Sequence, residues 1–165
     1  YLETKFDAGS AAAKDPVDRV SDRPDFAIIS YGRMDMNVPL ATGEKPMETI
    51  LPEKTQAAVD AINTVKFVTA NTSPTFIYST TGDKTVDSRN ATDFYNALKA
   101  AGVAAELHVF ELGAHGTHMG EALPAAEKEL AVTPILIANW MQQNGWMPPG
   151  VVEAETSKER VPRAK

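Results

Sequence analysis

The sequence predicts an α/β fold in which three parallel strands are flanked by helices. Apolar runs of strand length occur at 25–31, 75–79 and 105–112, and stretches with helical spacing of apolar residues separate or follow them. Strand and helix therefore alternate, and this alternation implies right-handed crossovers between parallel strands. The chain has 165 residues, of which 43% are apolar and 23% charged, so its composition is that of a globular domain with a buried core.

The first predicted strand, residues 25–31, reads DFAIISY and is almost continuously apolar. Such runs are typical of strands that are buried on both faces of a parallel sheet. An irregular segment rich in glycine, proline and methionine is expected over 32–51, and a short helix over 52–59. Residues 71–74 form a turn-type sequence that leads into the second strand.

The second predicted strand, 75–79, is followed by a helix over 89–101. Apolar side chains recur at helical spacing on one face of this helix. Asp87 or Ser88 can cap its first turn, and Gly102 is the expected stop.

The third predicted strand, 105–112, has the alternation of a strand covered on one face. Leu107 and Val109 alternate there with Glu106 and His108, and His108 is expected to be an ordinary strand histidine. A last helix is predicted from Thr133 to Asn144, with a proline at its first turn and a glycine at its end.

Composition and charge exclude several classes of partner. The net charge is −6 and the basic residues are dispersed, so the basic stripe that a nucleic-acid-binding protein needs is missing. The chain has no cysteine, which excludes disulfides and thiolate metal sites. No apolar run reaches membrane-spanning length, and no membrane partner is expected.

Two candidate functional residues follow the second and third strands. Asp83 comes after the second strand, and His115 lies on a glycine-flanked loop after the third. Parallel strands would bring these side chains to the same edge of the sheet. A carboxylate that accepts from one ring nitrogen fixes the tautomer and leaves the other nitrogen as a base, which is the acid–base half of a catalytic triad. Spacing alone leaves open an alternative, in which Asp83 is a turn residue and His115 has no partner.

The segments SPTFIYSTTGDKTVD (73–87) and FELGAHG (110–116) resemble the α/β-hydrolase superfamily. The similarity is to small carbohydrate esterases, including acetylxylan esterases and dienelactone-hydrolase-like enzymes, and it extends in order over about residues 1–147. The resemblance implies that Asp83 is the triad acid and His115 the triad base, and it implies no cofactor.

The serine nucleophile of this superfamily is missing from the sequence. It normally occupies a G-x-S-x-G turn between a strand and a helix, and no such motif is present. The resemblance implies that residues 1–150 are the C-terminal part of a hydrolase domain and that 151–165 are a polar, mobile tail. The nucleophile is then expected upstream, in an N-terminal half that is a second segment or chain, and the 165-residue chain alone is expected to be inactive.

The same resemblance implies a small ester substrate, for example an acetyl ester on a carbohydrate. Met34, Met36 and Met47 could line an acyl pocket or fill the core. Only the resemblance suggests a secreted or periplasmic location.

Three alternatives remain open at this stage. Ser30 precedes Asp83 and His115 in triad order, but no helix-forming sequence follows it, so a buried strand hydroxyl is the preferred interpretation. His115, His118 and Glu121 could form a metal-dependent hydrolytic site, although their glycine-rich spacing disfavours it. The chain could also be a non-catalytic, hydrolase-like module.

Overall fold

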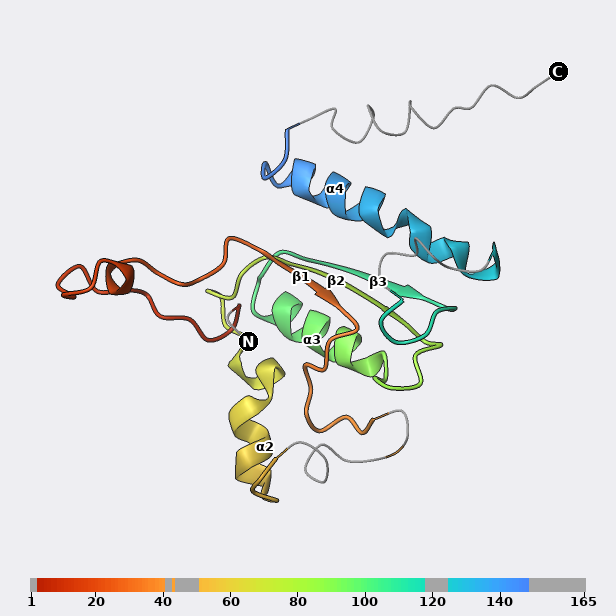
Figure 1. The fold of residues 1–165 in the computed structure, drawn as a ribbon, viewed down its shortest axis with the longest axis horizontal. Helices are drawn as coiled ribbons and strands as arrows, with labels where there is room; N and C mark the ends of the chain where they lie inside the picture. The colour runs from red at the N-terminus through yellow and green to blue at the C-terminus, as the bar shows by residue number, and fades with distance from the viewer. Residues whose placement is uncertain (1–2, 41–42, 44–50, 118–124, 149–165) are drawn as a thin grey trace. The chain divides into compact units, whose positions relative to one another are not determined.

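The computed structural model describes residues 3–40, 43, 51–117 and 125–148. The chain divides into two compact units, Tyr1–Thr117 and His118–Lys165 (Figure 1). The first unit contains the sheet together with Asp83 and His115. The expected domain boundary at residue 150 and the tail 151–165 lie outside the described residues.

The first unit is built on a parallel sheet of three strands, which confirms the predicted fold class. The strands are β1 (Ala27–Ser30), β2 (Thr75–Thr80) and β3 (Ala105–Phe110), in the order β1-β2-β3. In the register, Ser30 pairs with Tyr78, and Thr80 pairs with Phe110. The carboxyl ends of all three strands therefore lie at one edge of the sheet.

Helix α3 (Arg89–Ala100) connects β2 to β3 and contacts both strands. Ser88 occupies the N-cap position without a side-chain capping bond, whereas Asp87 Oδ1 accepts from the Arg89 backbone N–H at 2.8 Å. Gly102 follows the helix with a φ of +75°, a conformation that favours glycine. The predicted helix and its stop are thus confirmed, and Asp87 makes the capping contact.

A hydrophobic core joins α3 to one face of the sheet. Its buried members come from the loop after β1, from β2 and from the α3 region: Met34, Ile77, Ala91, Phe94, Leu98 and Val103. Met34 is therefore a core residue, and it also borders a pocket of about 230 Å³ beside Ile29 and Gly32. Met36 is also buried, and Met47 lies outside the described residues.

The outer strands are more exposed than their sequences predict. All six residues of β2 are buried, but β1 alternates between half-buried and exposed positions, and Ile28 is 39% exposed. The expectation that β1 is buried on both faces was wrong, because β1 is an edge strand of the described sheet. Val109, on the other edge strand, is exposed as well, so the predicted alternation in β3 does not describe its burial.

Short helices complete the first unit. They are the 3₁₀ helix η1 (Val17–Arg19), the α-helix α2 (Gln56–Ile62) and the 3₁₀ helix η2 (Thr64–Phe67). The helix predicted over 52–59 begins later than expected, because Thr55 caps α2 by accepting from the Ala58 N–H.

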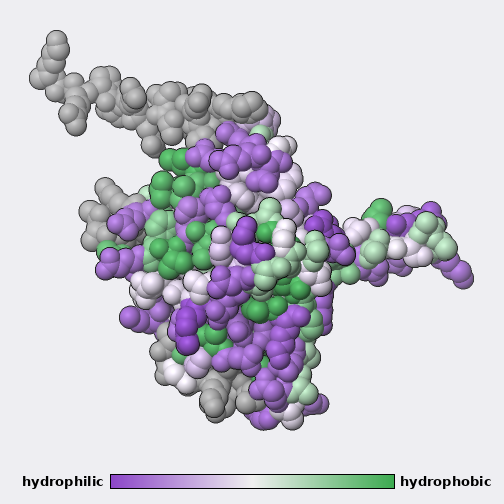
Figure 2. Space-filling model, turned by 180° about the vertical axis from the view of Figure 1, so that it is seen from behind, coloured by the Kyte–Doolittle hydropathy of each residue, from purple (hydrophilic) through white to green (hydrophobic). Residues whose placement is uncertain are grey.

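The second unit contains η3 (Ala125–Val132) and α4 (Thr133–Gln143). A proline lies in the first turn of α4, as predicted, and Ile137 and Trp140 are buried. None of the helices in the described ranges has the length and apolar character needed to cross a membrane. The face of the molecule in Figure 2 is largely hydrophilic, with separate apolar patches.

Candidate active site

The loops that follow β2 and β3 are bonded to each other at the carboxyl edge of the sheet. Thr80 Oγ1 donates to the Gly113 carbonyl at 2.6 Å, and the Thr81 N–H donates to the Phe110 carbonyl at 2.9 Å. A Cβ atom on Gly82 would lie 3.0 Å from the same Gly113 oxygen, so only glycine fits this approach without displacement. These contacts hold the loop that carries His115 against the loop that carries Asp83.

Asp83 and His115 form a hydrogen bond in this setting. His115 Nδ1 lies 2.8 Å from Asp83 Oδ2, and the Asp83 side chain is only 1% exposed. The other carboxylate oxygen, Oδ1, accepts from the backbone N–H groups of Thr85 at 2.7 Å and Val86 at 2.9 Å. The carboxylate is therefore fixed by donors on both oxygens.

The hydrogen bond to Asp83 determines which ring nitrogen of His115 can act as a base. A carboxylate only accepts, so the proton between the two groups belongs to Nδ1. The His115 side chain is 40% exposed, and its Nε2 has no hydrogen-bond partner among the described residues. A neutral imidazole held in this way presents an available lone pair at Nε2.

Tyr31 is a third residue at this edge, and sequence reasoning did not identify it. Its ring lies edge-on to His115, with centroids 5.9 Å apart, and edge-on to Tyr78 at 5.5 Å. Its hydroxyl lies 2.9 Å from Thr117 Oγ1. Burial raises the pKa of Tyr31, the bond to Thr117 opposes this, and the nearby Tyr78 and Asp83 raise it further. The one available signal was its position as the last residue of the first predicted strand, 25–31.

Ser30 lacks the setting of a nucleophile. It ends β1 and is exposed, so the expectation of a buried hydroxyl was wrong; an edge strand leaves that position open to solvent. Tyr31 and the following residues up to 40 form turns and irregular structure. A helix N-terminus directed at the reacting carbonyl is therefore absent after Ser30.

His108 does not join Asp83 and His115. His108 stacks on Phe76 and Phe110, and its Nε2 lies 2.8 Å from Glu106 Oε1. His118 and Glu121 of the metal hypothesis lie outside the described residues. Within the described part of the chain, no group of three potential ligand side chains could hold a metal ion.

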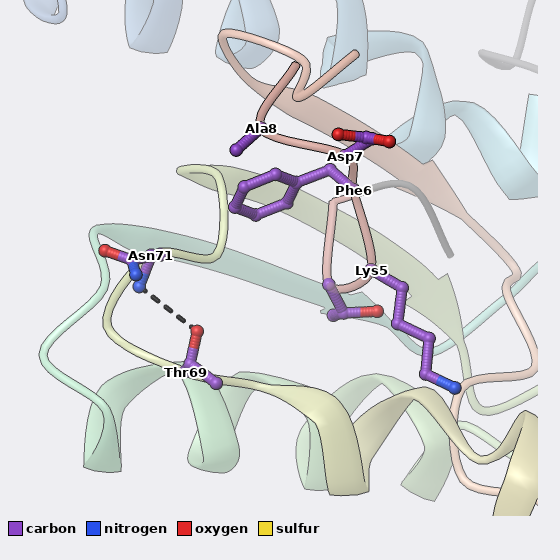
Figure 3. A pocket seen from close by; sticks show the side chains of 7 residues that line it. Lys5, Phe6, Asp7, Ala8, Thr69 and Asn71 are labelled. Atoms are coloured by element: carbon purple, nitrogen blue, oxygen red, sulfur yellow. Dashed lines mark hydrogen bonds between the residues drawn. The ribbon is translucent and has the colours of Figure 1, made fainter. Parts of the chain in front are cut away.

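A cavity of about 650 Å³ lies away from this edge, near the amino ends of the strands. In Figure 3 the Phe6 ring extends across it, and the dashed line marks the 3.2 Å bond from the Asn71 N–H to Thr69 Oγ1. It is lined by Thr4, Lys5, Phe6, Asp7, Ala8, Thr69 and Asn71. The cavity is thus separate from the Asp83–His115 pair.

The profile of the Prolyl oligopeptidase family matches residues 20–132, which is more than half of the chain. The chain belongs to the prolyl oligopeptidase family. The match includes Asp83 and His115, and it is consistent with the α/β-hydrolase resemblance of the sequence. The comparison with curated proteins gave no match.

Several solved structures similar to this chain are named as ester hydrolases. An acetyl ester-xyloside bifunctional hydrolase from Caldicellulosiruptor lactoaceticus is 29% identical, with a TM-score of 0.74 over 89% of this chain and 52% of its own. The carboxylesterase Cest-2923 from Lactobacillus plantarum is 22% identical, with a TM-score of 0.59 over 78% of this chain and 47% of its own. Esterase 2 from Thermogutta terrifontis, phosphonylated by sarin, is 21% identical, with a TM-score of 0.64 over 90% of this chain and 54% of its own.

These comparisons establish the α/β-hydrolase fold and membership in the prolyl oligopeptidase family. The two structures below 25% identity support the fold alone. The chain spans about half the length of the structures that it matches.

Proposed function

We propose that the complete protein is a serine-type carboxylic ester hydrolase, to which this chain contributes Asp83 as the triad acid and His115 as the triad base. The observation that carries the proposal is the 2.8 Å bond from His115 Nδ1 to the buried Asp83 carboxylate. Membership in the prolyl oligopeptidase family and the esterase activity of the similar structures support it.

The roles of the two residues follow from this geometry. As a serine hydroxyl attacks the ester carbonyl, His115 Nε2 accepts its proton, and the Asp83 carboxylate stabilises the resulting imidazolium. The imidazolium then protonates the leaving alcohol, which leaves an acyl-enzyme. In the second half-reaction, Nε2 accepts a proton from water as its oxygen attacks the acyl group, and the imidazolium then returns the proton to the serine oxygen as the acid product leaves.

The nucleophile is proposed to come from the N-terminal half of the same hydrolase, as a second segment or chain. The β1 strand supports this, because in the described sheet it pairs with β2 on one side only, and an unpaired edge can accept another strand. In serine hydrolases, loss of the nucleophile lowers turnover by about 10⁶. The chain without that half is therefore expected to be inactive toward esters.

The proposed substrates are short acyl esters, with acetyl groups on carbohydrate as the first case to test. The relative at 29% identity, which is named an acetyl ester-xyloside bifunctional hydrolase, supports this choice. The family is named for an oligopeptidase, so peptides are the second candidate substrate. A triad of serine, histidine and aspartate can hydrolyse amides as well as esters. Initial rates on acetylated xylan, 4-nitrophenyl acetate and a proline-containing peptide distinguish the two.

Labelling with a fluorophosphonate, followed by peptide mass analysis, tests the proposal. Covalent labelling of a serine outside the 165 residues, lost in a His115→Ala variant, is the expected result. A label on Ser30 would overturn the assignment of the nucleophile. An absence of label in the complete protein would instead favour the non-catalytic module.

A further inference from the structure

Tyr31 has an unfavourable backbone conformation at the carboxyl end of β1. Its φ is +53°, and among the described residues it is the one non-glycine residue with a positive φ. Such a conformation is disfavoured for a residue that carries a Cβ atom, and it persists where the surrounding structure requires it. Gly32 follows directly and could adopt a positive φ without this penalty. The positive φ is therefore placed at Tyr31 in spite of a more permissive neighbour.

Gly32 is required for a different reason. A Cβ atom at this position would lie 2.5 Å from Met34 Sδ and 2.6 Å from Ile29 Cγ2, both of which belong to the packed core region. Glycine at position 32 thus avoids a clash with these two side chains in the turn after β1. The left-handed conformation at Tyr31 has a different effect, because it sets the direction of the Tyr31 side chain.

The Tyr31 side chain reaches the far end of the His115 loop. Its hydroxyl lies 2.9 Å from Thr117 Oγ1, and the Thr117 hydroxyl also donates to the Ala114 carbonyl at 3.1 Å. Either hydroxyl can be the donor between Tyr31 and Thr117; when the single Thr117 proton goes to Ala114, Tyr31 donates to Thr117. The Tyr31 ring is buried, with 6% exposure, and packs edge-on against the His115 imidazole.

The His115 loop is thereby held at two points. Its first part is held through the bond from Thr80 to the Gly113 carbonyl, and its last part through the bond from Tyr31 to Thr117. Between these points, Gly113 and Gly116 have φ values of +131° and +72°, so both hinge positions are glycines with wide conformational freedom. The bond to Asp83 fixes one ring nitrogen but does not restrain the loop beyond His115.

We propose that Tyr31 is a positioning residue for His115, which tethers the His115 loop through Thr117 and supports the imidazole ring with its own ring edge. The role of this tether in turnover rests on the proposed function. The tether itself does not, because its effect on the Asp83–His115 bond can be measured without any substrate.

The test compares Tyr31→Phe, Thr117→Val and the double variant in the purified protein. NMR spectroscopy measures the solvent exchange of the His115 Nδ1 proton, which the bond to Asp83 protects. Loss of one intramolecular hydrogen bond is expected to speed this exchange about five- to tenfold in each single variant. Thr117→Val also removes the bond to the Ala114 carbonyl, so the double variant is compared with Thr117→Val and should exchange no faster than it, because Tyr31 then has no Thr117 hydroxyl to bind.

Two further variants separate a specific tether from general packing. Thr117→Ser keeps the hydroxyl and should exchange at the rate of the unmodified protein. Tyr95→Phe removes a hydroxyl from α3, at a half-buried position packed against the core, and should also leave the His115 proton unaffected. Exchange within about twofold of the unmodified protein in Tyr31→Phe, or additive effects in the double variant, would overturn the proposal.

Turnover in the complete protein provides the second readout. Tyr31→Phe should lower kcat about five- to tenfold with little change in KM, because a base is displaced and no substrate contact is lost. If the unmodified complete protein hydrolyses no ester or peptide while the exchange pattern is as expected, the proposed function fails and the tether stands. If the unmodified protein is active and Tyr31→Phe retains its full kcat, positioning by Tyr31 is refuted.

Discussion

Replacement of Asp83 by asparagine is the most direct test of the Asp83–His115 pair. The two carboxylate oxygens of Asp83 have different partners: Oδ1 accepts from the N–H groups of Thr85 and Val86, and Oδ2 accepts from His115 Nδ1. An asparagine has only one acceptor oxygen. Because two backbone donors face the Oδ1 position, the amide oxygen must occupy it, and the NH₂ group must face His115.

The Asp83→Asn replacement changes the tautomer of His115. Facing an NH₂ donor, Nδ1 must accept, so the ring proton moves to Nε2 and the lone pair needed for catalysis is lost. The size and packing of the side chain hardly change, so the fold and KM should be retained. We expect kcat to fall by about 10⁴, which corresponds to about 5 kcal/mol in the activation free energy.

The assay combines turnover of 4-nitrophenyl acetate by the complete protein with ¹⁵N NMR spectroscopy of the His115 ring. Asp87→Asn is the matched control, because Asp87 caps α3 and, among the described residues, its carboxylate is hydrogen-bonded only to Arg89. This control should retain turnover and the Nδ1 proton. If Asp83→Asn kept kcat within about tenfold of the unmodified protein, or kept the proton on Nδ1, the assigned roles would be wrong.

Three further predictions concern the site and the core. Gly82→Ala places a Cβ atom 3.0 Å from the Gly113 oxygen and should separate the two loops, lowering turnover about 10²-fold. The control is Gly102→Ala, whose Cβ atom would have no neighbour within 4 Å, and it should change the free energy of unfolding but not turnover. Phe94→Ala removes a side chain with 0% exposure and should lower the free energy of unfolding by about 3–5 kcal/mol in urea titrations. The folded-state pKa of Tyr31 is raised above its ordinary value of 10.0, so folding favours the neutral phenol. As the pH rises above about 10, the unmodified protein should therefore lose stability faster than Tyr31→Phe in pH-dependent unfolding.

The sequence was sufficient to predict the secondary structure around β2, α3 and β3. These elements combine an apolar strand, a helix with one apolar face and a glycine stop, and such signals act over a few residues. It also placed Asp83 and His115 at one sheet edge, because parallel strands bring their carboxyl ends together. The spacing left open whether the two side chains bond to each other, and the folded chain answers this with the 2.8 Å bond from His115 Nδ1 to Asp83 Oδ2.

The solvent exposure of side chains in the edge strands could not be predicted from the sequence. The apolar run in β1 is the same whether one or two strands flank it, so composition could not show that Ile28 is 39% exposed. The exposure of Ser30 has the same cause. Only the strand order in space determines which apolar run lies at an edge.

The contribution of Tyr31 depends entirely on tertiary structure. Tyr31 and Thr117 are 86 positions apart in the chain, and their bond requires the left-handed turn after β1 and the glycine-hinged loop after β3. No local pattern in the sequence connects them, because a hydrogen bond depends on distance and direction in space. Local patterns therefore determined Asp83, His115 and the strands that present them, whereas the folded chain decided which side chains contact the His115 loop.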